Sequence, residues 1–387
     1  MGARQKSLKV LHIVESLDNQ ATETWLRHAH RYLRESGSGD RWTFFSINGP
    51  GAHDDEVRGW GGEVVHSPVR MTQTAAMLAS LEQAFVTREF DAIDCHHDIM
   101  SALYLWALRR AKVKKRIVHV HNTSLALPTP SRIKKALARE PMRLYCLSAA
   151  DHIVGVSEPA LSAFLNGRRA RSGRDHVIHC GIQTERFRPD SAQRALMRAK
   201  YGVDERTMVI LFAGRMIEYK NPLFVLDVLE SVIDGGHRAV ALMAGDGPVA
   251  TQLSQEAEGR GLRGAVHVLG WQDDIAPLMH ASDVMLLPSM EDPPEGLGLG
   301  VVEAQAAGLP VVMSFSVPPE AVIVPEIAKR MRLGEGAGAW ASALNELLSG
   351  PLPSRESAAS AVAASSFSMS RSMESLISLY EPSRTAP

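Results

Sequence analysis

The stretch LLPSMEDPPEGLGLGVVEAQAAGLPVVMS, residues 286–314, decides the fold of this chain. One apolar run, Val284–Leu287, enters the stretch, and a second, Leu309–Met313, closes it. The pattern predicts a strand, a glycine loop, a helix and a second strand. We expect the helix over about Leu299–Ala307, because Gly308 is the residue type that commonly follows a helix C-terminus.

Two glutamates, Glu295 and Glu303, stand on either side of the glycine run of this stretch. Glu295 falls in the predicted loop, and Glu303 falls about one turn inside the predicted helix. The loop glycines let a ligand approach the backbone, and the helix N-terminus offers free N–H groups to a phosphate. If the two glutamates stood alone, we would expect their side chains to lie on the solvent-exposed surface of a helix. The glycines and flanking strands favour a phosphate-binding site instead.

The length, net charge and cysteine content of the chain restrict the classes of protein to which it can belong. The 387 residues suffice for two domains, and a net charge of −1 gives no general attraction to nucleic acid. The three cysteines, Cys95, Cys146 and Cys180, are too few for a disulfide framework and indicate a reducing compartment. No signal-peptide core follows the N-terminus, and no apolar run approaches about 18 residues. We expect a cytoplasmic protein, with peripheral contact at the inner face of the membrane as an option.

Strands and helices alternate through the first half of the chain. Strands are expected at Leu8–Val14, Trp42–Ile47, Gly62–His66, Asp91–Cys95, Arg116–Val120, His152–Val156 and His176–His179. The alternation predicts a parallel sheet with helices on both faces. Ligands of such sheets bind beyond the carboxyl ends of the strands. The loop 15–22, His96–Asp98 and His121–Ser124 should therefore share one edge.

A second alternating series follows Phe187–Asp190, which we interpret as a linker together with the polar, alanine-rich segment after it. Its strands are expected at Met208–Ala213, Ala239–Ala244, Ala265–Leu269 and in the central stretch. Past Ser314 we expect only helices, the last over Ser370–Tyr380. The fold class is therefore α/β, with two Rossmann-like, doubly wound parallel-sheet domains facing a cleft.

Arg215 and Lys220 lie five positions apart, just past a predicted strand. A planar guanidinium and a mobile ammonium together suit a diphosphate. Two cations beside a helix N-terminus could stabilise a departing phosphate without a metal ion. The alternative is a surface pair near Glu218.

His119 and His121 flank Val120 at a strand end and should point the same way. This spacing could bind a metal ion, with His96 and Asp98 completing the site. No His-Glu-x-x-His, EF-hand or Walker A pattern accompanies it, and buried histidines with satisfied hydrogen bonds are the alternative. The sequence contains no serine nucleophile elbow, and its cysteines lack a nucleophile context.

Basic residues gather at two places, 112–116 and 168–171. Solvated faces are the ordinary interpretation of such clusters. Contact with anionic lipid is the alternative.

Several motifs together resemble a known family. They are LKVLHIVESL (8–17), RIVHVHNTS (116–124), DHIVGVS (151–157), VIHCGIQTERFRP (177–189), GRMIEYKNP (214–222), AGDGP (244–248), LGWQDDI (269–275) and EGLGLGVVEAQAAGLPVV (295–312). The chain resembles the retaining GT-B glycosyltransferases of family 4, in particular the EpsF-like exopolysaccharide transferases. The resemblance covers nearly the whole chain and rests most on the glutamate pair combined with the arginine–lysine element.

The resemblance implies a role for each matching residue. Arg215 and Lys220 would hold the donor diphosphate, and Glu303 would accept hydrogen bonds from the ribose. Glu295 would bind the transferred sugar, and His121 would lie near the reacting centre. The remaining donor-binding positions implied are Gly298, Leu299, Gly245, Asp246, Gly270 and Trp271. The catalytic set is then His121, Glu295, Arg215 and Lys220, with no cofactor and no metal ion.

The resemblance also implies the division of the chain and its partners. Residues 1–188 would form the acceptor-side domain, residues 189–366 the nucleotide-sugar domain, and a last helix, about 367–387, would cross back onto the first. The donor would be a nucleotide-sugar, most readily a UDP-sugar. The acceptor would be a polysaccharide or lipid-linked glycan. The sugar would keep its anomeric configuration.

Two departures from the family pattern affect the expected site. The acceptor-side loop contains Asn19, Gln20 and Ala21. Gln20-Ala21 stands where the family usually has a glycine pair, and these side chains would crowd that loop. Asp292-Pro293-Pro294 looks like a small insertion before Glu295 that could reshape the sugar pocket. The altered loop leaves open a catalytically silent relative that acts as a binding or partner subunit. A nucleotide-sugar epimerase of the same fold and a metal-dependent hydrolase are further alternatives.

Overall fold

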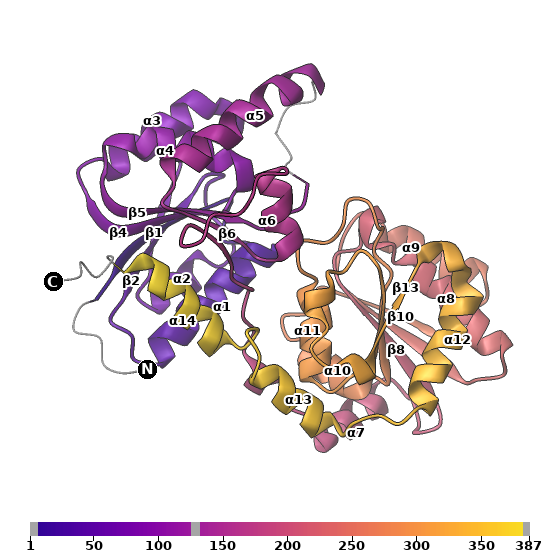
Figure 1. The fold of residues 1–387 in the computed structure, drawn as a ribbon. Helices are drawn as coiled ribbons and strands as arrows, with labels where there is room; N and C mark the ends of the chain where they lie inside the picture. The colour runs from indigo at the N-terminus through magenta and orange to yellow at the C-terminus, as the bar shows by residue number, and fades with distance from the viewer. Residues whose placement is uncertain (1–6, 125–131, 382–387) are drawn as a thin grey trace. The chain divides into compact units, whose positions relative to one another are not determined.

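A computed structural model describes residues 7–124 and 132–381 of the chain. The chain divides into two compact units (Figure 1). The first unit comprises Met1–Ile182 and Met369–Pro387, and the second comprises Gln183–Ser368.

The first unit is built on a seven-stranded parallel sheet in the order β3-β2-β1-β4-β5-β6-β7. Its strands are β1 (Lys9–Val14), β2 (Arg41–Ser46), β3 (Glu63–His66), β4 (Glu89–Cys95), β5 (Lys112–Val120), β6 (His152–Gly155) and β7 (Asp175–Val177). Its helices are α1 (Ala21–Glu35), α2 (Asp54–Gly59), α3 (Thr74–Phe85), α4 (Ser101–Ala107), α5 (Arg132–Ala149), α6 (Glu158–Leu165) and α14 (Met369–Tyr380). The central strand β1 is buried from Val10 to Val14, as expected for a strand covered on both faces.

The last helix, α14, belongs to the first unit. The Ser372 hydroxyl donates to the His179 carbonyl at 2.6 Å and accepts from the Gly181 N–H at 3.1 Å. The Tyr380 hydroxyl, fully buried, donates to the Asp94 carboxylate at 2.6 Å. These bonds connect the end of the chain to the carboxyl-end region of the first sheet.

The second unit has a six-stranded parallel sheet in the order β10-β9-β8-β11-β12-β13. Its strands are β8 (Met208–Ala213), β9 (Ala239–Ala244), β10 (Val266–Gly270), β11 (Val284–Leu287), β12 (Val311–Ser314) and β13 (Ala328–Met331). Its helices are α7 (Ser191–Lys200), α8 (Leu223–Asp234), α9 (Ala250–Gly259), α10 (Ala276–Ala281), α11 (Leu299–Ala306), α12 (Gly336–Ser349) and α13 (Arg355–Ala363). The central stretch forms β11, loop, α11 and β12, as predicted.

Two expectations about the second unit were wrong. The segment after Phe187–Asp190 is the helix α7, which packs on α10 through the nearly buried Arg198, so it is no linker. Beyond Ser314 the chain adds an edge strand, β13, before its helices resume. β13 is short and carries Lys329 and Arg330, so it lacks the apolar run by which we recognised the other strands.

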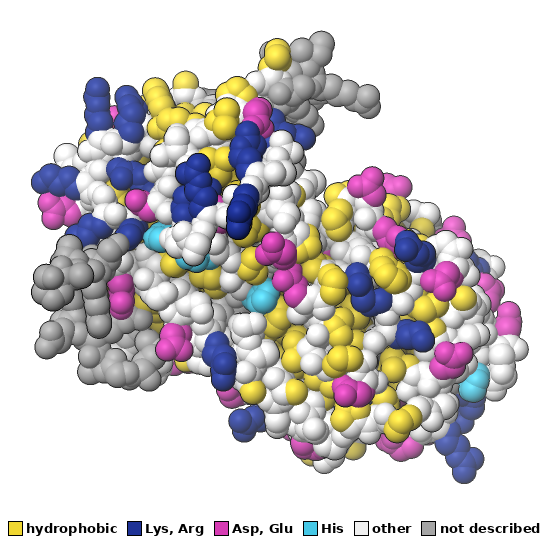
Figure 2. Space-filling model, viewed as in Figure 1, with side chains coloured by type: hydrophobic (Ala, Val, Ile, Leu, Met, Phe, Trp, Pro, Cys, Tyr) yellow, Lys and Arg dark blue, Asp and Glu magenta, His cyan; other side chains and the backbone are white. Residues whose placement is uncertain are grey.

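Within the described residues, no helix is both long and apolar enough to cross a membrane. All three cysteines are buried and unpaired. The basic residues at 112–116 are partly neutralised, since Lys112 pairs with Glu89 at 3.1 Å and Lys114 with Asp91 at 2.6 Å. Over the second unit, basic and acidic side chains are interspersed on the face in view (Figure 2). The charges there form no single-sign patch on that face.

Candidate active site

Backbone hydrogen bonds join the loops that follow β8, β9 and β10. The Gly214 N–H donates to the Ala244 carbonyl at 3.0 Å, and the Gly245 N–H donates to the Gly270 carbonyl at 2.8 Å. A Cβ on Gly245 would lie 1.8 Å from the Gly214 carbonyl oxygen, and its φ of +133° also favours glycine. The loops can therefore approach this closely only without a side chain here. Their contact fixes the position of the backbone at Arg215.

The neighbouring residues of these loops show the same close approach. A Cβ on Gly247 would lie 2.4 Å from the Met216 carbonyl oxygen. The exposed Asp246 accepts from the Gly247 N–H at 2.7 Å. Trp271 is exposed, and its indole N–H donates to Asp273 at 2.9 Å. Gly245 and Gly270 of the predicted donor-binding set thus lie where the loops pack together, while Asp246 and Trp271 present side chains to solvent.

The two predicted diphosphate-binding cations have different surroundings. Arg215 is exposed, and its guanidinium has no hydrogen-bond or ion-pair partner within residues 7–124 and 132–381. Lys220 instead pairs with Glu295, Nζ to Oε1 at 2.5 Å, with side-chain exposures of only 17% and 8%. The Ser289 hydroxyl donates to the same carboxylate oxygen at 2.5 Å. The structure therefore brings the predicted phosphate-binding lysine to the predicted sugar-binding glutamate.

The backbone at Glu295 is held from the loop after β12. The Glu295 N–H donates to the Ser316 carbonyl at 2.9 Å and lies 3.1 Å from its hydroxyl oxygen. The Tyr219 hydroxyl lies 3.2 Å from the same Ser316 hydroxyl. Burial, together with the charge of Glu295, raises the pKa of Tyr219 to about 12. Tyr219 therefore stays neutral beside this carboxylate at neutral pH.

Glu303 lies in α11, whose N-terminal boundary residue, Gly298, has a φ of +80°. Within the described part of the chain, no side chain or backbone group hydrogen-bonds to the Glu303 carboxylate. Burial raises the pKa of Glu303 to about 7, although Arg186 lowers it and Asp274 raises it further. Arg186 itself pairs with Asp274 at 3.1 Å. Glu303 is thus a carboxyl group with free hydrogen-bonding capacity.

Ser289 and Arg186 are among the residues near this site that were not sequence candidates. Ser289 follows β11 and has no distinguishing pattern in the sequence. Arg186 lies within the quoted motif at 177–189, which is the signal that could have drawn attention to it.

In the first unit, His121 is held at the end of β5 by Asp98. The Asp98 carboxylate accepts from the His121 N–H at 2.7 Å and from the Asn122 side-chain amide at 2.8 Å. Asp98 has a φ of +43°, and burial raises its pKa. Both carboxylate oxygens therefore already accept hydrogen bonds, and among the described residues Asp98 is not in the groups of potential metal ligands that contain His96.

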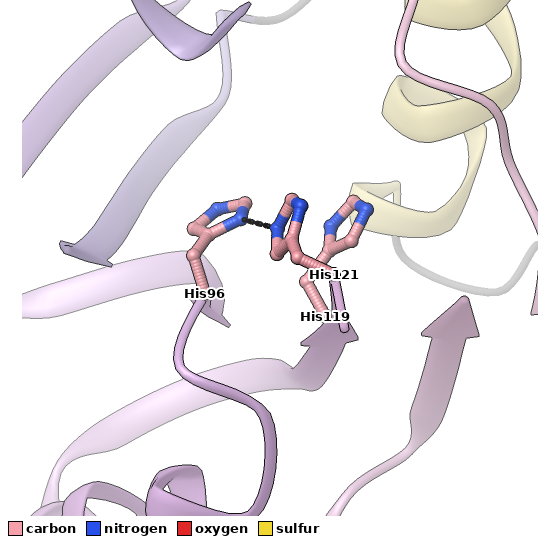
Figure 3. A group of neighbouring side chains, drawn as sticks. All are labelled: His96, His119 and His121. Atoms are coloured by element: carbon pink, nitrogen blue, oxygen red, sulfur yellow. Dashed lines mark hydrogen bonds between the residues drawn. The ribbon is translucent and has the colours of Figure 1, made fainter. Parts of the chain in front are cut away.

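Instead, His121 belongs to a row of imidazoles. His121 Nε2 lies 3.1 Å from His96 Nδ1 (Figure 3), and His96 Nε2 lies 3.0 Å from His12 Nδ1. Burial lowers the pKa of each of these three histidines well below its usual value, so they are neutral at neutral pH. The buried Nε2 atoms of His12 and His119 lack hydrogen-bond partners in the described regions. The hydrogen bonds of these two histidines are therefore not fully satisfied.

Asp94 provides the negative charge beneath this row. Its Oδ2 lies 3.4 Å from His119 Nδ1, 3.6 Å from His96 Nε2 and 2.6 Å from the Tyr380 hydroxyl. Burial alone would raise the pKa of Asp94, but interactions with His96 and His119, together with hydrogen bonds from His119 and Tyr380, lower it to about 2. Asp94 is therefore an ionised carboxylate that is completely buried.

The acceptor-side loop lies before and at the start of α1. Asn19, Gln20 and Ala21 are exposed, and the Asn19 side-chain oxygen lies 2.6 Å from His53 Nε2. Gln20 is the N-cap residue of α1 and makes no side-chain capping bond. Glu23, one turn further on, is buried, and burial raises its pKa to about 7. The loop is therefore accessible and lies close to a carboxyl group that titrates near neutral pH.

Two family models match the chain. The model described as Glycosyltransferase Family 4 matches residues 22–186, and the model described as Glycosyl transferases group 1 matches residues 193–364. The first match lies in the first unit except for residues 183–186, and the second lies within the second unit.

Among similar proteins is EpsF of Bacillus subtilis (strain 168), which is named as a glycosyltransferase. It is 27% identical over 98% of this chain and 97% of its own length. The Escherichia coli UDP-Gal:alpha-D-GlcNAc-diphosphoundecaprenol alpha-1,3-galactosyltransferase is 25% identical over 67% of each chain. The D-inositol 3-phosphate glycosyltransferase of Mycobacterium marinum is 26% identical over 81% of this chain and 68% of its own length.

Solved structures share the fold. Anabaena Alr3699/HepE in complex with UDP-glucose superposes with a TM-score of 0.75 at 20% identity, covering 96% of this chain and 100% of that one. WaaG, a glycosyltransferase involved in lipopolysaccharide biosynthesis, gives a TM-score of 0.69 at 16% identity, covering 96% and 97%. The family models and the relatives named as glycosyltransferases favour a transferase over a silent relative or an epimerase. The chain therefore belongs to the family 4 glycosyltransferases and is a transferase of the GT-B fold.

Proposed function

We propose that the chain transfers a sugar from a UDP-sugar to a glycan or lipid-linked acceptor, with retention of the anomeric configuration. The observation that carries this proposal is the buried Lys220–Glu295 pair in the same unit as the unpaired Arg215 and the N-terminus of α11. Relatives support the donor class, because HepE was crystallised with UDP-glucose and the E. coli relative is named for UDP-Gal. The diphosphoundecaprenol in the latter name supports a lipid-linked acceptor.

In the proposed complex, cations and backbone dipoles hold the diphosphate. Arg215 can give both ends of its guanidinium to phosphate oxygens, because no described residue occupies it. The N–H groups of the first turn of α11 attract negative charge. Lys220 then stabilises the charge that develops on the departing phosphate, as a preorganised donor does. On this proposal the transfer needs neither a metal ion nor another cofactor.

The two glutamates would bind the other parts of the donor. Glu295 is oriented by Lys220 and Ser289, which leaves its second carboxylate oxygen for hydroxyls of the transferred sugar. Glu303 has no hydrogen-bond donor within the described ranges, so it can accept bonds from two ribose hydroxyls. On the acceptor side, His121 would lie near the reacting centre, and Asn19, Gln20 and Ala21 would line the approach.

Calorimetric titration of the full chain with UDP, GDP and ADP, each with and without a divalent metal, tests the donor class. We expect UDP to bind in the presence of a chelator. Tighter binding of GDP or ADP would indicate a GDP-sugar or an ADP-sugar as the donor instead. Binding that occurs only with the metal would contradict the metal-free site.

Hydrolysis of UDP-glucose and UDP-galactose in the absence of acceptor then tests the chemistry. We expect Lys220→Ala to lower the turnover by about 100-fold, because one transition-state donor is lost. An unchanged turnover in a correctly folded variant would remove Lys220 from the mechanism. The anomeric configuration of a product formed on an undecaprenyl-diphosphate-sugar acceptor, read by NMR coupling constants, tests retention.

We also propose peripheral contact with anionic lipid through the surface of α4 and α5. These helices pack together and expose Trp106, Leu137 and Leu144, while Arg109 stacks on Trp106 at 4.3 Å from the ring centre. Exposed aromatic and leucine side chains beside arginine suit the interfacial region of a bilayer. We expect Leu137→Glu to reduce co-sedimentation with vesicles containing phosphatidylglycerol. Equal sedimentation of the variant and the unaltered protein would contradict this contact.

A further inference from the structure

The first unit contains a histidine cluster on three adjacent strands of its sheet or directly after them: His12, Asp94, His96, His119 and His121. Two of its triads, His96 with His119 and His121, and His12 with Asp94 and His96, each have potential ligand atoms within 4.8 Å of one another. The transfer chemistry proposed above uses only His121. The other four side chains are buried, and burying so many polar groups is unfavourable unless they are partnered.

The first triad has the donor atoms of a three-histidine metal site. His96 Nδ1 and His121 Nε2 lie 3.1 Å apart. Two nitrogens bound to the same tetrahedral zinc ion lie about 3.3 Å apart, which is close to this distance. The ring of His119 lies beside that of His121, with centres 4.7 Å apart (Figure 3). His119 Nε2 is buried and has no hydrogen-bond partner within residues 7–124 and 132–381. One potential ligand atom from each of the three rings lies within 4.8 Å of the other two.

Asp94 occupies the position of the outer carboxylate in such a site. Metal-binding histidines usually donate the N–H of their second nitrogen to a carboxylate, which fixes the tautomer and makes the ligand more basic. Asp94 Oδ2 lies 3.4 Å from His119 Nδ1 and 3.6 Å from His96 Nε2. In both rings these are the nitrogens that would not bind the metal. The Tyr380 hydroxyl anchors the same carboxylate oxygen at 2.6 Å.

We propose that His96 Nδ1, His119 Nε2 and His121 Nε2 bind one Zn²⁺-class transition-metal ion, with Asp94 as the outer carboxylate. Imidazole nitrogen suits this class of ion, whereas Mg²⁺ and Ca²⁺ prefer oxygen ligands. Binding replaces the N–H···N bond between His96 and His121 with two nitrogen–metal bonds, and the proton of that bond moves to the other nitrogen of its own ring. The fourth coordination position opens beside His121, the only partly exposed member of the triad.

This ion would be an inhibitor rather than a cofactor. It would bind His121, the residue that the proposed transfer places near the reacting centre. This consequence rests on the proposed function, whereas the metal site itself does not. Binding and inhibition are therefore measured separately.

The binding experiment uses the full chain without a histidine tag, treated with chelator and titrated with Co²⁺. We expect one Co²⁺ per chain with the intense visible absorption of a four-coordinate site, and displacement by one equivalent of Zn²⁺. His119→Gln should weaken the affinity at least about 100-fold, and Asp94→Asn should weaken it about 10- to 100-fold. His152→Gln is the matched control, because His152 and His176 form a second imidazole pair at 3.2 Å that has no place in the proposed site.

Absence of four-coordinate Co²⁺ absorption in the unaltered chain would overturn the proposal, and this result needs no variant to fold. Equal Co²⁺ affinity in folded His119→Gln, or loss of affinity in folded His152→Gln, would also overturn it. Zn²⁺ should in addition inhibit hydrolysis of UDP-glucose. Tight Zn²⁺ binding without inhibition would leave the metal site standing and remove His121 from the proposed reaction.

Discussion

The pKa of Glu303 predicts how donor affinity depends on pH. Burial raises this pKa to about 7 in the free protein. Ribose hydroxyls donate hydrogen bonds to the ionised carboxylate, so donor binding should lower the pKa toward its ordinary value of about 4.5. A protonated Glu303 must then lose its proton when the donor binds. The affinity for the donor is therefore highest above about pH 7 and decreases as the pH falls below that value.

The size of the effect follows from the two pKa values. Between about pH 7.5 and pH 5.5, the dissociation constant should rise about 20-fold, because about 97% of the free protein is protonated at the lower pH. The ligand should be UDP-glucose rather than UDP, since a terminal phosphate itself titrates near pH 6. Calorimetry in buffers of different ionisation enthalpy should also show release of nearly one proton per donor bound at about pH 5.5.

Glu303→Gln is the control for this experiment. The amide keeps a carbonyl acceptor of similar shape but does not titrate. We expect weaker binding at about pH 7.5, by roughly 10-fold or more, since a bond to a charged acceptor is lost. The affinity of this variant should vary little with pH. An equal pH dependence in both proteins would refute the ribose role and assign the titration to another group.

Three further predictions concern stability, measured by chemical denaturation. Lys220→Met should lower the free energy of unfolding by about 3 kcal/mol, because it leaves a buried carboxylate without its cation. Arg260→Met breaks a more exposed ion-pair network and should lower it by less than about 1 kcal/mol. Similar losses in the two variants would contradict the buried-pair argument. Gly245→Ala should cost more than about 2 kcal/mol, since its Cβ would meet a carbonyl oxygen at 1.8 Å, and a loss under about 0.5 kcal/mol would show that the loops can separate. Tyr380→Phe should cost about 1.5–3 kcal/mol, because the buried Asp94 carboxylate loses a hydroxyl donor at 2.6 Å; an unchanged midpoint would mean that another group replaces it.

The sequence by itself determined the repeating units of this protein. The apolar runs predicted most strands to within about two residues, since a strand buried on both faces needs a continuous apolar segment. The glycine run and the following apolar residues predicted α11, which spans Leu299–Ala306. Arg215 and Lys220 were expected together because they follow the same strand. These inferences depend on residues that are close in sequence.

Other elements lacked such a local signal. β13 pairs with β12 although its residues include Lys329 and Arg330. It is a strand because the edge of β12 supplies partners for its backbone groups. α7 was predicted to be a linker because its sequence is polar. It is a helix whose nearly buried Arg198 bonds to the carbonyls of Ala281 and Thr207.

Only the tertiary structure decided which functional side chains meet. Lys220 and Glu295 are 75 positions apart, and Asp94 and Tyr380 are 286 apart. Both pairs join side chains from segments whose contact depends on how the sheet and helices pack. The elevated pKa of Glu303 likewise follows mainly from its burial in the folded chain. Local residue patterns set the elements, whereas the packing of distant segments sets ion pairing, desolvation and protonation.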